Sequence, residues 1–190
     1  PVMGAIGVYI PPMSYWKEVE RICRQYDVLL VADEVICGFG RTGQWFGCQH
    51  FGFQPDVMTI AKGITSGYIP LGAALFNDRV AGVLKEAGGE LAHGATYSGH
   101  PVCAAVALEN LRIMRDEQIV ERAREEVAPY LAQRWAELGQ HRLVGEARIV
   151  GFMGALELVP DKRRRAFFPE RGKVGGLCRD IALRHGLILR

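Results

Sequence analysis

Two short apolar runs constrain the fold of this chain more than any other feature. DVLLVADEV at 27–35 and DVMTIAKG at 56–63 are apolar through the middle and charged at the end. Runs of this length without polar alternation are typical of strands buried on both faces, as in a parallel sheet. LGAALF at 71–76 predicts a third strand, and helical patterns precede and follow the three runs. Strands that alternate with helices place the chain in the α/β class.

Asp33 and Lys62 stand at the ends of the first two runs. In open α/β sheets, ligands bind beyond the carboxyl ends of the strands, so both side chains can face one crevice. An aspartate there can hold a metal, orient a base or pair with a cationic heterocycle. A lysine whose pKa is lowered by partial burial can act as a nucleophile. Each residue also has a simpler interpretation, Asp33 as a hydrogen-bonded strand end and Lys62 as a surface lysine, so residue chemistry alone suggests a Schiff-base site without establishing it.

The stretch GFGRTG at 38–43 has the G-x-G-x-x-G spacing of a dinucleotide-binding turn. That turn has to open a helix, and an acidic residue has to end the next strand. The following residues, 44–56, show no helical period, and Asp56 precedes the next apolar run instead of ending it. A phosphate-binding loop would need a lysine where Gln44 stands. We therefore expect no helix after this turn and no nucleotide bound to it.

The composition gives no reason to expect nucleic acid or an anionic membrane as a partner, because 23 basic and 21 acidic residues leave a net charge of +2. No apolar run approaches the roughly 18 residues of a membrane span. The five cysteines are widely spaced and form no C-x-x-C pair, which is typical of reduced thiols. Cys48 and His50 are too few ligands for a metal site. We expect a cytoplasmic protein without a metal.

The pattern of the chain changes near residue 119. Before it, a helix predicted from Pro101 carries its apolar residues on one face, at Val102, Ala105, Leu108 and Leu111. After it, 119–138 is helical and charged, with Pro129 kinking the helix or starting another. Residues 143–159 predict strands, and 175–186 predict a helix that ends at Gly186. We expect a second, smaller domain from residue 119 onward.

Three longer motifs follow one another in order, ADEVICGFGRTG at 32–43, PDVMTIAKGITSGYIPLGA at 55–73 and HGATYSGHPVCAAVALEN at 93–110. Together they resemble the class III aminotransferases, pyridoxal-phosphate enzymes of fold type I. The resemblance extends over essentially the whole chain, and APYLAQRW at 128–135 is similar to the ω-amine or polyamine:pyruvate branch. It implies a C-terminal piece of such an enzyme. Residues 1–118 would be the later part of the large, mostly parallel PLP-binding domain, and 119–190 part of a small C-terminal α+β domain.

The resemblance also implies a role for five residues. Asp33 would pair with the protonated pyridine nitrogen of pyridoxal 5'-phosphate, and Val35 would pack on one face of the ring. Lys62 would form the internal aldimine and move a proton between substrate and cofactor. Thr96 would bind the phosphate from the partner subunit, so that a homodimer shares its active sites. Arg190 would bind a substrate carboxylate through a bidentate contact.

The implied reaction transfers an amino group from an ω-amino acid, amine or diamine to a keto acid such as pyruvate. An aminomutase, racemase or decarboxylase of the same fold is the main alternative, and a catalytically silent fragment is another. A nucleotide-binding oxidoreductase would rest on GFGRTG alone. The chain departs from the family at one strand position, where relatives carry a glycine after the arginine and Arg148 is here followed by Ile149.

Overall fold

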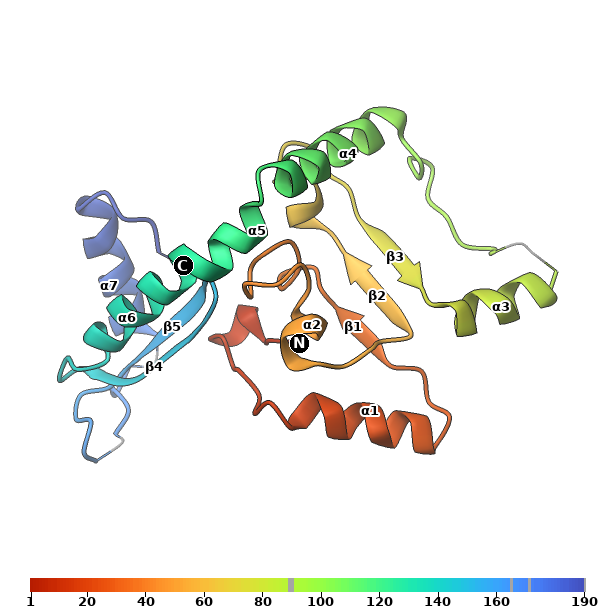
Figure 1. Cartoon of the computed structure of the whole chain (residues 1–190). Helices are drawn as coiled ribbons and strands as arrows, with labels where there is room; N and C mark the ends of the chain where they lie inside the picture. The colour runs from red at the N-terminus through yellow and green to blue at the C-terminus, as the bar shows by residue number, and fades with distance from the viewer. Residues whose placement is uncertain (89–90, 165, 171, 190) are drawn as a thin grey trace.

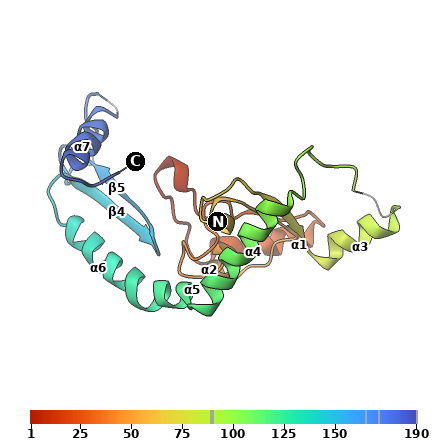
Figure 2. The ribbon, with the colours of Figure 1, turned by 90° about the horizontal axis from the view of Figure 1, so that it is seen from above.

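The computed structural model describes residues 1–88, 91–164, 166–170 and 172–189. They form two separate sheets joined by a row of helices (Figure 1). The row consists of α4 (Pro101–Asp116), α5 (Ile119–Arg122), the π-helical turn η3 (Ala123–Val127) and α6 (Ala128–Leu138). Seen from above, this row curves along one side of the molecule, from the first sheet to the second (Figure 2). The helical path therefore continues through Pro129, with the π-helical turn immediately before α6.

The first sheet has three strands in the order β1 (Val31–Asp33), β2 (Val57–Ile60) and β3 (Ala73–Phe76). β1 and β2 are parallel, with Val31 opposite Val57 and Asp33 opposite Thr59, whereas β2 and β3 are antiparallel. All three strands lie where the apolar runs predict them. The sheet is thus the mixed α/β arrangement expected from the sequence, with a parallel pair at its first two strands.

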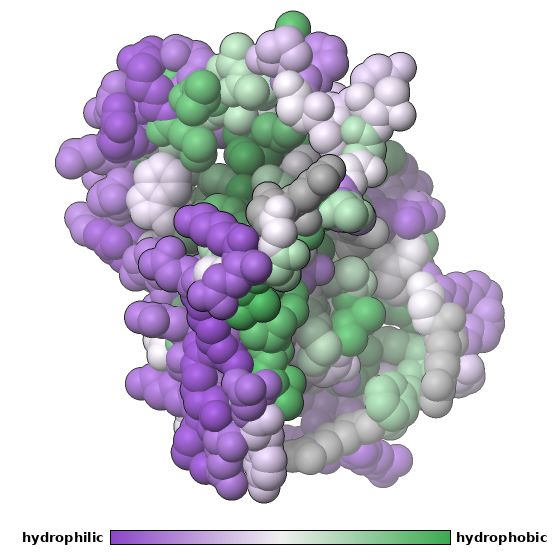
Figure 3. All heavy atoms as spheres, turned by 90° about the vertical axis from the view of Figure 1, so that its right-hand side faces the viewer, coloured by the Kyte–Doolittle hydropathy of each residue, from purple (hydrophilic) through white to green (hydrophobic). Residues whose placement is uncertain are grey.

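One face of β1 is buried and the other is exposed, which corrects the prediction of burial on both faces. Leu30 and Ala32 pack in the main core, but Val31 is 54% exposed, and all four residues of β3 are exposed. No element in the described part of the chain covers that face. On the β3 side, hydrophobic residues lie open between hydrophilic ones (Figure 3). An apolar run indicates which residues prefer burial, and it does not show whether this chain supplies the cover on both faces.

The core beneath β1 is closed by α1 (Tyr15–Gln25) and by the short helix α2 (Gly47–Phe51). From α1, Trp16 stacks on Phe53, with ring centroids 5.0 Å apart, and donates its indole N–H to the carbonyl of Pro1. Ser14 is the N-cap residue of α1, but its side chain makes no capping hydrogen bond to the helix. The 3-10 turn η1 (Gly4–Ile6) precedes α1 in the chain, and α3 (Asp78–Glu86) follows β3.

The second sheet is the antiparallel hairpin of β4 (Val144–Val150) and β5 (Met153–Leu158), which is followed by α7 (Lys173–Arg184). Ile149 pairs with Gly154, so β4 runs straight through the position where the family carries a glycine. Gly154 is needed for packing, because a Cβ atom there would lie 2.8 Å from the ring of Trp135 on α6. The strands and the α7 helix lie where the sequence predicts them.

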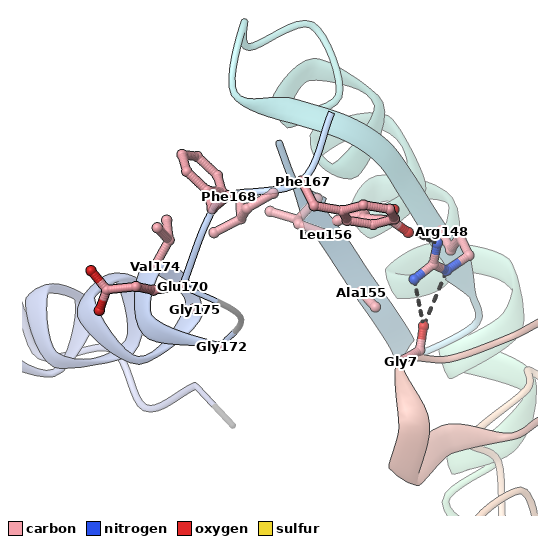
Figure 4. A pocket seen from close by; sticks show the side chains of 12 residues that line it. Gly7, Arg148, Ala155, Leu156, Phe167, Phe168, Glu170, Gly172, Val174 and Gly175 are labelled. Carbon is pink, nitrogen blue, oxygen red and sulfur yellow. Dashed lines mark hydrogen bonds and ion pairs between the residues drawn. The ribbon is translucent and has the colours of Figure 1, made fainter. Parts of the chain in front are cut away.

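Arg148 fastens this hairpin to the N-terminal segment. Its Nε and Nη2 atoms donate to the carbonyl of Gly7, at 3.1 and 2.9 Å, and its guanidinium lies 4.8 Å from the ring centroid of Tyr9. Nη1 donates to the carboxylate of Glu157 at 3.0 Å. Gly7, Arg148 and Glu157 also border a groove of about 450 Å³ between the hairpin and α7 (Figure 4). None of the residues predicted to bind the cofactor lines that groove.

The buried carboxylate of Asp56 fixes the start of the parallel strand pair. It accepts hydrogen bonds from the backbone N–H of Leu30 at 2.8 Å, from Arg24 at 2.6 Å and from Asn77 at 3.0 Å. Burial alone would raise the pKa of Asp56, but these donors outweigh it and lower the pKa to about 2.

No helix in the described part of the chain is long and apolar enough to cross a membrane.

We expect Asp56→Asn to lower the free energy of unfolding of the full-length protein by about 2–3 kcal/mol at neutral pH, because buried donors lose a charged acceptor. A carboxylate whose folded-state pKa is depressed stabilises the fold above its unfolded pKa of about 3.9 and loses that contribution as pH falls toward about 2. The difference from wild type should therefore shrink between about pH 4 and pH 2 in denaturant titrations.

Asp27→Asn is the matched control. Asp27 is 91% exposed and forms an ion pair with Arg79, which also contacts Asp56. Breaking an exposed pair should cost less than about 1 kcal/mol. Equal losses in the two variants would contradict the central role of Asp56.

Candidate active site

The parallel pairing of β1 and β2 brings Asp33 and Lys62 to the same edge of the first sheet. Asp33 ends β1 opposite Thr59, and the next residue, Glu34, donates its N–H to the Thr59 carbonyl at 2.9 Å. Lys62 comes three positions after Thr59 and opens the 3-10 turn η2 (Lys62–Thr65). Two residues that are distant in sequence therefore leave neighbouring strand ends on one side of the sheet, as the sequence predicts.

Lys62 has a left-handed backbone conformation, with φ of +49°. This region is unfavourable for a residue with a Cβ atom, and such residues concentrate at functional sites. The conformation ends β2 sharply and starts η2 at the lysine itself. The Lys62 side chain is exposed on the described part of the chain.

Asp33 and Val35 form a small turn at the end of β1. The Oδ1 atom of Asp33 accepts the backbone N–H of Val35 at 3.0 Å. Asp33 is exposed and Val35 is half-buried. The expected strand-end hydrogen bond is therefore present, and it engages one of the two carboxylate oxygens.

Glu34 points to the opposite side and is completely buried. Its carboxylate oxygens accept the backbone N–H groups of Gly47, at 2.8 Å, and Cys48, at 2.6 Å. These residues open α2, so the expectation that no helix follows GFGRTG is wrong. A five-residue helix is too short to show a period in sequence. Its N-terminal donors are occupied by Glu34, which leaves them unavailable to a nucleotide phosphate.

The thiol of Cys48 is held in its neutral form. Burial, assisted by the nearby Glu34 carboxylate, raises the pKa of Cys48 to about 12. Burial also lowers the pKa of His50. Among the described residues, no group of three or more histidine, cysteine, aspartate or glutamate side chains is arranged to hold a metal ion.

The GFGRTG loop turns through two glycines with positive φ, Gly40 at +90° and Gly43 at +82°. Phe39 donates its N–H to the carbonyl of Trp45 at 2.6 Å, which closes the loop. The Phe39 side chain lies against η2, since a Cβ atom on Gly63 would lie 2.8 Å from the Phe39 Cβ. The loop that follows Asp33 is therefore packed directly on the residue that follows Lys62.

Thr96 is not brought to this edge by the structure. Thr96 lies in an exposed turn in which Ser98 donates its N–H to the carbonyl of Ala95 at 2.9 Å. This turn belongs to the connection between α3 and α4, which runs outside the first sheet (Figure 1). Arg190 lies outside the described residues.

Comparison with known proteins identifies this arrangement. The family model for class III aminotransferases matches residues 1–187. The chain belongs to the class III aminotransferases. Its α/β fold is that of the fold type I enzymes of this class, which use pyridoxal phosphate.

The chain is similar to several named members of this class. It is 57% identical over 190 residues to the putrescine–pyruvate aminotransferase of Pseudomonas aeruginosa, covering 100% of this chain and 41% of that protein. It is 46% identical over 194 residues to the diaminobutyrate–2-oxoglutarate transaminase of Halomonas elongata, with the same coverage. A thermostable (S)-enantioselective ω-transaminase from Thermomicrobium roseum is 46% identical with a TM-score of 0.94, and the match covers 100% of this chain and 42% of that one. The chain thus spans about two fifths of the length of these relatives.

In this class III chain, the face of α4 that meets the Lys62 turn differs from the predicted face. Val102 and Leu108 are 55% and 68% exposed. The buried positions are Cys103, Ala107 and Met114. Asn110 lies on this inner face and hydrogen-bonds to η2. Apolar periodicity indicated the face with Val102 and Leu108 because that face also carries large apolar side chains. Asn110 on the packed face is polar, so the apolar pattern did not point to it.

We expect Glu34→Ala to lower the free energy of unfolding by about 2–3 kcal/mol, because two buried N–H groups at the start of α2 lose their acceptor. Its neighbour provides the control. Asp33→Ala removes a single exposed hydrogen bond, so it should cost below about 1 kcal/mol. Denaturant unfolding of the two variants without cofactor measures both values. A larger loss for Asp33→Ala than for Glu34→Ala would contradict the assignment of Glu34 as the residue that holds α2.

Proposed function

We propose that the full-length protein containing this chain is a pyridoxal-phosphate-dependent aminotransferase. It would take an amino group from an ω-amino acid, a monoamine or a diamine and pass it to a keto acid such as pyruvate. The observation that carries the proposal is the placement of Asp33 and Lys62 at the ends of two parallel, paired strands. The likeness to a putrescine–pyruvate aminotransferase supports amines as donors and pyruvate as acceptor.

The residues at this edge fit the cofactor. Asp33 offers a carboxylate whose Oδ2 atom has no hydrogen-bond partner among the described residues, as a cationic ring nitrogen requires. Within the same part of the chain, the Lys62 amine is exposed, as a reaction with an aldehyde requires. Both groups have access to the same open edge. A chain in which Asp33 and Lys62 paired with each other would fit the cofactor poorly.

Each residue has a distinct task in the proposed reaction. The cofactor supplies a cationic ring that withdraws electrons from the substrate. Asp33 holds the proton on the ring nitrogen, because a carboxylate beside that nitrogen favours its protonated form. Val35 would help to hold the ring in place. The Nζ atom of Lys62 removes and returns the proton at the substrate carbon, acting as a general base and then as a general acid.

We further propose a homodimer with shared active sites. Thr96 lies outside its own first sheet in an exposed turn, which suits a role as phosphate ligand for the partner subunit. Near that turn, Leu91, Val102 and Leu108 expose apolar side chains that a second subunit would cover. The resemblance assigns Arg190 to a substrate carboxylate, and this residue lies outside the described part of the chain.

The proposed domain division places residues 1–118 in the large cofactor-binding domain and 119–190 in the small domain. The presence of two separate sheets on either side of α4 and α5 supports this division. We propose the cytoplasm as the compartment, because all five cysteines are free thiols.

We expect borohydride reduction of the full-length protein with pyridoxal phosphate, followed by peptide mapping, to place the label on Lys62. Lys62→Ala should abolish this label and lower keto-acid-dependent amine loss by several orders of magnitude, because it removes both the attachment point and the proton carrier. Lys85→Ala, at an exposed position of α3, is the control and should leave both unchanged.

Two outcomes would count against the proposal. Label spread over several lysines, with Lys62 unmodified, would remove the assigned site. Amine turnover that proceeds without any keto acid would favour an aminomutase, racemase or decarboxylase of the same fold.

Labelling of Lys62 in the full-length protein but not in the 190-residue chain would show that the chain needs additional polypeptide to bind the cofactor.

A further inference from the structure

Asn110 makes three hydrogen bonds to the turn that carries Lys62. Its Nδ2 atom donates to the carbonyl of Gly63 at 3.1 Å and to that of Ile64 at 3.0 Å. Its Oδ1 atom accepts the hydroxyl of Ser66 at 2.7 Å. One amide thus binds Gly63, Ile64 and Ser66, three residues of the segment that begins at Lys62. No other side chain among the described residues makes as many hydrogen bonds to this segment.

The turn needs such support because its own geometry is weak. Lys62 and Ser66 both have φ of +49°, a conformation that side chains disfavour. One of its backbone hydrogen bonds is long, at 3.3 Å from the N–H of Ile64 to the carbonyl of Ala61, and the bond from Ser66 to Gly63 is of ordinary length at 3.1 Å. A short 3-10 turn has poorer hydrogen-bond geometry than an α-helix. The conformation therefore depends on contacts from outside the turn.

Those contacts come from two elements. Phe39 packs against Gly63 from the loop that follows Asp33. Asn110 binds from the 16-residue helix α4. Asn110 lies near the middle of α4 and is only partly exposed, so its amide is held in place by the helix. Within the described part of the chain the Lys62 side chain makes no hydrogen bond or ion pair, and it is exposed at the edge of the sheet.

We propose that Asn110 is a positioning residue for the amine of Lys62. By holding the carbonyls of Gly63 and Ile64, it fixes the backbone direction from which the lysine side chain leaves. This role rests on the proposed function, since it concerns the proton transfer that Lys62 carries out. An error of about 1 Å in the position of a reacting group can lower the rate about a hundredfold. The role requires an amide, because only an amide offers donors to two carbonyls and an acceptor to one hydroxyl.

Asn110→Asp tests this role, because aspartate has nearly the same shape and keeps the acceptor for Ser66. It replaces the donor group with an oxygen that faces two carbonyl oxygens. Glu109→Gln is the control, since Glu109 is the neighbouring residue on α4 and pairs with Arg112 on the exposed surface. Ser66→Ala is a milder variant at an exposed position, and it removes one of the three hydrogen bonds.

The variants are compared in the full-length protein by three measurements. Steady-state kinetics separate kcat from KM for the amine and for the keto acid. Visible circular dichroism of the bound cofactor reports its orientation. Hydrogen exchange of the amides of residues 62–66 in the protein without cofactor reports the stability of the turn and requires no activity.

For Asn110→Asp we expect kcat to fall about tenfold to a hundredfold, with KM changed less than about twofold. Exchange of the 62–66 amides should rise at least about tenfold, and the dichroism of the cofactor should change. Ser66→Ala should change these quantities in the same direction by a smaller factor, and Glu109→Gln should change none of them. If Asn110→Asp does not fold, Ser66→Ala decides the matter.

Specific results would overturn the inference. An unchanged kcat in Asn110→Asp, in a protein whose wild type is labelled at Lys62, would remove the role of Asn110 and leave the proposed function intact. A lower kcat with unchanged exchange at 62–66 would mean that Asn110 does not act through the turn. A wild type that is not labelled at Lys62 would remove the proposed function, and the role of Asn110 with it.

Discussion

The parallel pairing of β1 with β2 is the constraint on which the candidate site depends. Asp56 sets this pairing at the start of both strands, because its carboxylate accepts the N–H of Leu30 and its own N–H donates to the Leu30 carbonyl. Strands that are aligned at their start and nearly equal in length end together. That alignment brings Asp33 and Lys62 to the same edge of the sheet, although 28 residues separate them in sequence.

The sequence predicted those parts of the structure that depend on local chemistry or on long motifs. The strands, the β4–β5 hairpin and α7 follow from apolar runs and from glycines, and each lies where it was expected. Asp33 and Lys62 were identified because strand ends in an α/β sheet have a known place in space. Their roles in cofactor binding came from the resemblance to a family, since a carboxylate and an amine at strand ends are compatible with several kinds of site.

The sequence could not reveal features that depend on contacts between distant segments. Glu34 and Asp33 are adjacent acids, yet one is buried under α2 and the other is exposed, and no local pattern distinguishes them. The packed face of α4 was misassigned for the same reason, because both faces carry apolar residues and Asn110 is polar. The exposed face of β1 is a different case. Its apolar run predicted burial on both faces, but no element among the described residues covers the face that carries Val31.

The GFGRTG loop is confined between two neighbours. On one side Phe39 lies against Gly63. On the other side Phe152, at the tip of the hairpin, donates its N–H to the carbonyl of Arg41 at 2.9 Å, and a Cβ atom on Gly151 would lie 2.4 Å from that oxygen. Glycine-rich surface loops usually accept added residues readily. Here an inserted residue would have to displace either the lysine turn or the hairpin, so the length of this loop is as constrained as that of a buried strand.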